Sequence, residues 1–278
     1  MYERYIDGVT YVVDENNVLV KDIESSLKSV MILSEIDGKP VTKIGHFGFS
    51  NGKELESIIL PDCLIEIGLG AFQGCFNLNS IVIPNSVKTI GISAFSKCYE
   101  LKSITIPDSV EEISSYAFHW CSSLISIVIP ASVTKIRPYT FQLCLNVKSI
   151  VLPDTITEIG KRAFSDCQAI ENITIPDSVE KIEKEAFYTC CNLKEIKLPK
   201  KIRHIPENCF IHCGNLESIT LPDSLSTVNK AAFKDCRSIK HVYFSETLTK
   251  RKNADKVFER IFNAGLKTRE VLLQQPNM

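Results

Sequence analysis

The chain has 278 residues, 44% of them hydrophobic and 23% charged, and a formal net charge of −1 at pH 7. This is the composition of an ordinary soluble protein with enough apolar material for a substantial core. A nearly neutral chain creates no global field that would attract nucleic acid or an anionic membrane, and no stretch approaches the roughly 18 to 20 apolar residues that cross a bilayer. We therefore expect no nucleic-acid partner and no membrane span.

The first 40 residues carry the signals of a small antiparallel structure. Two runs of β-forming residues, Tyr5-Ile6 and Val9–Val13, flank the turn dipeptide Asp7-Gly8, and Asn16-Asn17 marks a second turn. We predict a β-hairpin or meander over residues 1–40 that caps the rest of the chain. No basic segment followed by an apolar one opens the sequence. A full-length chain would therefore be cytoplasmic, whereas a trimmed one would belong at the cell surface or be secreted.

Residues 41–247 repeat with a period of 23 residues, in nine units without insertion. The phenylalanine series is Phe49, Phe72, Phe95, Phe118, Phe141, Phe164, Phe187, Phe210 and Phe233. The proline series is Pro61, Pro84, Pro107, Pro130, Pro153, Pro176, Pro199 and Pro222. The cysteine series is Cys75, Cys98, Cys121, Cys144, Cys167, Cys190, Cys213 and Cys236. Units this short cannot bury their own apolar residues, so they must stack and share one continuous core.

Each unit predicts one coil of a solenoid. In a middle unit, Ile104 and Ile106 alternate with Ser103 and Thr105, as in a strand with one buried face. Pro107 has no amide donor and should end that strand, and residues 94–98 should form a short 3₁₀ or helical turn. The predicted fold is a β-rich solenoid with a parallel β-sheet, short 3₁₀ or helical turns and a cap at each end.

The cysteine series predicts packing, because a free cysteine behaves as a small apolar residue. Disulfides or a bound metal are the alternatives. The strongest set for zinc, which prefers four tetrahedral Cys or His ligands, comprises Cys190, Cys191, His204, Cys209, His212 and Cys213. Cys190 and Cys213 belong to the inward-facing series, so we expect no metal.

Residues 248–278 predict a helical cap. Apolar residues recur there at helical spacing, namely Ala254, Val257, Phe258, Ile261 and Phe262. The rival interpretation is a helix that binds a partner.

The repeat resembles a known family. The pattern IPDSVxxIxxxAFxxCxxLxxIxIP, present at Ile106 to Pro130 and at Ile175 to Pro199, is similar to the BspA-like, or Treponema-type, leucine-rich repeats. The resemblance covers about residues 41–247 and implies a leucine-rich-repeat solenoid, nominally of the α/β horseshoe type, without enzymatic activity. It also implies kinship with bacterial and protist surface proteins, many of which adhere to host proteins or to other cells.

No catalytic constellation is evident. The sequence has no GxSxG, HExxH, Walker A or EF-hand motif, and its five histidines show no spacing that suggests a triad. We predict no enzyme, no catalytic residue, no cofactor and no metal.

The outward strand positions form two columns, and solenoids bind partners on such extended surfaces. The first column is Ser57, Ser80, Ser103, Ser126, Ser149, Asn172, Glu195, Ser218 and His241. The second column is Ile59, Val82, Thr105, Val128, Val151, Thr174, Lys197, Thr220 and Tyr243. An exposed apolar stripe often marks an interaction site, although Val and Thr suit any strand.

We take as candidate partner-binding residues Ile59, Val82, Thr105, Val128, Val151, Thr174, Glu195, Lys197, His241, Tyr243 and Trp120. Trp120 is the only tryptophan and occupies a variable position, where it could anchor a partner or fold down onto the neighbouring coil. The favoured function is a scaffold that binds a protein, with a glycan as a further candidate ligand. A cell-surface adhesin and a purely structural or self-assembling solenoid are the alternatives.

Overall fold

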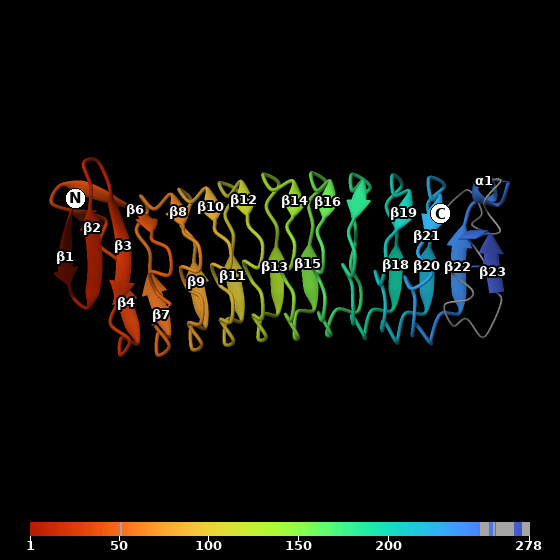
Figure 1. The fold of residues 1–278 in the computed structure, drawn as a ribbon, viewed down its shortest axis with the longest axis horizontal. Helices are drawn as coiled ribbons and strands as arrows, with labels where there is room; N and C mark the ends of the chain where they lie inside the picture. The colour runs from red at the N-terminus through yellow and green to blue at the C-terminus, as the bar shows by residue number, and fades with distance from the viewer. Residues whose placement is uncertain (51, 251–255, 258, 260–269, 274–278) are drawn as a thin grey trace. The chain divides into compact units, whose positions relative to one another are not determined.

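The computed structural model describes residues 1–50, 52–250, 256–257, 259 and 270–273 (Figure 1). The chain divides into two compact units. The first comprises Met1–Val133 and Thr140–Leu145, and the second comprises Thr134–Tyr139 and Asn146–Met278. Both are built from short parallel strands in successive coils, which confirms the predicted solenoid fold.

The first unit begins with an antiparallel meander. Strands β1 (Tyr2–Ile6), β2 (Val9–Val13) and β3 (Val18–Ile23) lie side by side, and β3 then pairs in parallel with β6 (Lys39–Ile44). The turn between β1 and β2 places Asp7 and Gly8 at φ 47° and 79°, the left-handed pair that a two-residue hairpin turn requires. A second hairpin joins β5 (Glu35–Ile36) to β6.

One row of strands carries the outward columns. In the first unit these strands are β4 (Ser29–Met31), β7 (Ser57–Ile59), β9 (Ser80–Val82), β11 (Ser103–Thr105) and β13 (Ser126–Val128). In the second unit they are β15 (Ser149–Val151), β18 (Glu195–Lys197), β20 (Ser218–Thr220), β22 (His241–Phe244) and β23 (Glu270–Leu273). From β4 to β18, each three-residue strand of this row buries its middle residue and exposes the two that flank it.

A second row consists of two-residue strands. In the first unit it runs from β6 through β8 (Glu66–Ile67), β10 (Thr89–Ile90) and β12 (Glu112–Ile113). In the second unit its members are β14 (Lys135–Ile136), β16 (Glu158–Ile159), β17 (Lys181–Ile182), β19 (His204–Ile205) and β21 (Thr227–Val228). The parallel register pairs each residue with the one 23 positions later, as in Ile67 with Ile90. The sequence period is therefore the length of one coil.

The core is built from ladders of identical residues. In the first unit the ring of Phe95 stacks between those of Phe72 and Phe118, with centroid distances of 5.1 and 5.5 Å. The cysteines of the series are free thiols, and their sulfurs are buried. Each thiol hydrogen bond that the structure shows in this series reaches back to the carbonyl of a core phenylalanine, as in Cys98 Sγ to Phe72 O at 3.2 Å. A small side chain with a weak donor suits this position better than alanine or valine would.

The expected 3₁₀ or helical turn is not confirmed, because two left-handed residues interrupt each such segment. In the coil of Phe95, Ser93 and Lys97 have φ values of 55° and 62°. A 3₁₀ helix needs negative φ throughout, so the segment is instead a succession of turns closed by bonds such as Cys98 N to Phe95 O. A left-handed conformation costs an L-residue roughly 1 to 2 kcal/mol.

Replacing Thr189 with glycine should therefore stabilise the protein by about 1 kcal/mol. Thr189 is a β-branched residue at φ 57°, and Gly74 occupies the equivalent position in the first unit at φ 78°. Urea unfolding of Thr189→Gly against the parent protein measures the effect. Thr174→Gly, on an exposed extended segment, is the control and should be destabilising; equal losses in both variants would contradict the strain argument.

The C-terminal region contains a strand as well as helical residues. Helix α1 (Glu246–Thr249) follows the last repeat, and residues 256–257 and 259 are helical, with Val257 buried. Strand β23 then pairs in parallel with β22, an element that the prediction of a helix over residues 248–278 did not include. Ala254, Phe258, Ile261 and Phe262 lie outside the described residues.

Candidate protein-binding surface

The first unit presents an exposed apolar column on its strand row. Met31 and Ile59 are each 64% exposed, Val82 is 76% exposed and Val128 is 61% exposed. The pairing of β4 with β7 sets Met31 beside Ile59, and that of β9 with β11 sets Val82 beside Thr105. All the outward positions of these strands from β7 to β13 are apolar or carry a hydroxyl group, so this face has no charge.

Met31 is a member of this column that the repeat period did not reveal. It precedes Ile59 by 28 residues instead of 23, because the coil that contains it also includes the hairpin of β5 and β6. The alternation Ser29, Val30, Met31, with only the middle residue buried, is the signal that could have identified it.

The second unit places most of the irregular outward residues together. Glu195, Ser218 and His241 are in register across β18, β20 and β22, and so are Lys197, Thr220 and Tyr243. Thr174, Glu195, Lys197 and Tyr243 all line a hollow of about 340 Å³ over these strands. The ring of His241 lies against that of Tyr243, with centroids 6.1 Å apart. Val151 is exposed on β15 but does not line the hollow.

The hollow lies where a predicted strand is reduced to one bridge. Among the described residues, 172–174 join the row only through the parallel bridge between Asn172 and Glu195. Asn172 stands where most coils have serine, and asparagine is depleted in strands. The repeat pattern predicted a regular strand here, and the structure shows a recess flanked by a carboxylate and an ammonium group.

Trp120 belongs to an aromatic cluster on the turn segment. Its indole is 37% exposed and lies edge-on to Tyr99 at 5.6 Å and to His119 at 6.1 Å, with Lys97 Nζ 6.0 Å from the ring centroid. Burial and the nearby Lys97 charge lower the pKa of His119. The side chain therefore both packs on the neighbouring coil and remains accessible, and none of these contacts involves the outward columns.

The cysteines of the zinc hypothesis are arranged for packing. Cys190 and Cys213 are buried and donate to the carbonyls of Phe164 and Phe187. Burial raises the pKa of the Cys209 thiol well above its ordinary value, whereas a metal ligand or nucleophile needs the thiolate. Within the described ranges, no group of three or more His, Cys, Asp or Glu side chains could hold a metal ion. No described helix has the length and apolar character to span a membrane.

Stacked 23-residue coils with inward-facing leucine, isoleucine and phenylalanine define a leucine-rich-repeat protein. The sequence model of the BspA type leucine rich repeat region matches residues 24–147 and 134–261, and the chain belongs to this family. Leucine-rich-repeat proteins of this kind are generally non-enzymatic.

Solved structures with the same fold come from several bacteria. A leucine-rich repeat protein of Bacteroides ovatus is 22% identical with a TM-score of 0.59, and the match covers 99% of this chain and all of that one. A leucine rich cell surface protein of Faecalibacterium prausnitzii is 23% identical with a TM-score of 0.55, over 99% and 95% of the two chains. The leucine rich repeat protein of T. pallidum is 24% identical with a TM-score of 0.50, over 96% and 97%. No curated protein matched the chain. At these identities the likeness shows the fold alone.

Proposed function

We propose that the protein is a non-enzymatic scaffold that binds another protein through the outward face of its strand row. The observation that carries this proposal is the exposed apolar column of Met31, Ile59, Val82 and Val128 in the first unit. Isolated apolar residues are common on protein surfaces, but apolar residues aligned on neighbouring coils often mark an interaction site.

The chemistry of this face suits a protein partner. The cores of protein interfaces are poor in charged residues, and the outward positions from Ser57 to Val128 consist of Ser, Thr, Val and Ile. Serine is small, so the branched side chains of the second column stand above the first and can insert into a partner. In the second unit, Glu195 and Lys197 add a pair of opposite charges beside the hollow, which would favour one orientation of the partner.

The double variant Val82→Asp/Val128→Asp should reduce partner retention at least about tenfold, because it places charges in the desolvated centre of the interface. The measurement is affinity capture with mass spectrometry, compared with the parent protein after circular dichroism has shown that the variant is folded. Ile65→Asp/Ile92→Asp is the matched control, because both residues are exposed but lie outside the outward columns. Equal loss in both variants, or retention by the strand-face variant, would contradict the proposal.

Two further tests separate the alternatives. Biotinylation of intact cells would label the protein if it acts as a surface adhesin. A molecular mass in light scattering that rises with concentration would favour a self-assembling solenoid over a scaffold, and a constant monomer mass would exclude it.

A further inference from the structure

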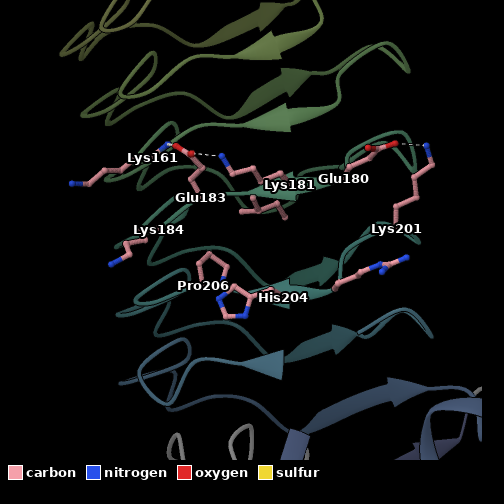
Figure 2. A pocket seen from close by; sticks show the side chains of 10 residues that line it. Lys161, Glu180, Lys181, Glu183, Lys184, Lys201, His204 and Pro206 are labelled. Carbon is pink, nitrogen blue, oxygen red and sulfur yellow. Dashed lines mark hydrogen bonds and ion pairs between the residues drawn. The ribbon is translucent and has the colours of Figure 1, made fainter. Parts of the chain in front are cut away.

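A groove opens in the second unit on the row of two-residue strands, away from the outward columns. It lies between the coils of β17 and β19 and has a volume of about 810 Å³. Figure 2 shows the side chains that surround it. The lining residues are Lys161, Glu180, Lys181, Ile182, Glu183, Lys184, Lys201, Arg203, His204 and Pro206.

Proline at position 206 explains why the groove is there. In other coils, the amide that follows the two-residue strand donates to the preceding coil, as in Glu183 N to Ile159 O and Asn229 N to Ile205 O, both at 2.9 Å. Pro206 has no amide hydrogen, so it cannot make the equivalent bond to Ile182. Of the described strands, β17 pairs with β16 and β19 pairs with β21, and no ladder joins β17 to β19.

Cationic side chains flank the groove at both ends. Lys161 and Lys184 lie at one end and Lys201 at the other, with Pro206 and the ring of His204 between them (Figure 2). Five lysine and arginine side chains line the groove against the two carboxylates of Glu180 and Glu183. The groove therefore has an excess of positive charge in a chain whose net charge is −1.

Two of these cations have no carboxylate partner. Lys201 pairs with Glu180 at 2.7 Å, and Lys184 pairs with Glu207 at 2.8 Å. Among the described residues, neither Lys161 nor Arg203 forms an ion pair. Lys161 Nζ lies 5.9 Å from the centroid of the Tyr139 ring. These two groups are available to pair with the anionic groups of a ligand.

We propose that this groove binds a short acidic peptide segment in which carboxylates alternate with apolar side chains. The carboxylates pair with Lys161 and Arg203, and an apolar side chain covers Ile182 and Pro206. Glu180 and Glu183 on the rim repel a ligand that is charged at every unit, such as a sulfated polysaccharide or a nucleic acid. They tolerate a peptide whose charges are spaced.

The test is fluorescence anisotropy at low ionic strength, where surface electrostatics are weakly screened. The probe is an end-blocked, fluorescein-labelled peptide of alternating glutamate and leucine, and its control is the same peptide with glutamine for glutamate. We expect the parent protein to bind only the acidic probe. Lys161→Gln/Arg203→Gln should weaken binding at least about tenfold, whereas Lys102→Gln/Lys148→Gln, at exposed lysines outside the groove, should leave it unchanged.

A third variant tests the origin of the groove. Pro206→Ala supplies the amide donor that Ile182 lacks, so it should narrow the groove, weaken probe binding and raise the midpoint of urea unfolding. Val82→Asp/Val128→Asp should bind the probe like the parent protein, which separates this site from the strand face.

Three results would overturn the proposal: equal binding of the acidic and glutamine probes, full binding by Lys161→Gln/Arg203→Gln, or no binding by the parent protein. Binding of a sulfated oligosaccharide in place of the peptide would overturn the peptide assignment.

Discussion

Replacing Phe95 with alanine should lower the free energy of unfolding by about 3 to 5 kcal/mol, the usual cost of removing a buried phenylalanine. The ring is completely buried and stacks on both neighbours of its ladder. Because the rings above and below are held by their own coils, the cavity cannot collapse easily. The loss also falls on two interfaces between coils, and these interfaces supply the cooperativity of a repeat protein.

Urea unfolding followed by circular dichroism measures this effect. Phe47→Ala is the matched control, because Phe47 lies in the same unit and is about half exposed. Its substitution should cost far less than that of Phe95. If the two variants unfolded at the same midpoint, the stacked rings would not be the main support of the core.

Stability should fall steeply once the pH rises above about 9, because the buried thiols resist ionisation. Burial raises the pKa of Cys75 and of Cys144 to about 12, from an ordinary value of 9.0. Below pH 9 both the folded and the unfolded chain keep these protons. Above it the unfolded chain releases them and the folded chain does not, so the unfolding free energy decreases with pH until the folded thiols ionise near pH 12.

Each such thiol should contribute a slope of about 1.4 kcal/mol per pH unit over this window. The measurement is urea unfolding under reducing conditions at several pH values from 8 to 11. Cys144→Ala should flatten the pH dependence by one thiol. Cys63→Ala should not, since Cys63 is only half-buried; an identical slope in both variants would exclude the buried thiols as the cause.

The sequence was sufficient to predict the fold, because the inward and outward alternation is written into every coil. Ile104 is buried and Ser103 and Thr105 are exposed, as their period of two requires. The left-handed residues were not predictable in this way. Position 97 and its equivalents hold Lys, Trp, Leu, Asp, Thr and His, and only the glycine at position 74 signals the conformation. Tertiary contacts impose it against the preference of the residue.

The binding surface was predictable only in its regular part. The exposure of Ile59, Val82 and Val128 follows from strand alternation alone. The recess near Asn172 and the groove at Pro206 depend on which backbone groups face one another in adjacent coils. A proline is visible in the sequence, but its effect appears only when the register assigns its missing hydrogen bond to Ile182.

The constant coil length has a consequence for how such a chain can change in length. Within the first unit each strand meets its neighbour 23 residues away without a shift. Excising residues 64–86 would therefore join Cys63 to Val87 and leave every phenylalanine, cysteine and isoleucine facing the core. Removing one residue fewer would rotate the chain downstream by one position and turn its inward side chains outward. Recombination between repeats thus yields folded products when it occurs in whole coils, which allows the length of the binding face to vary while its cross-section stays fixed.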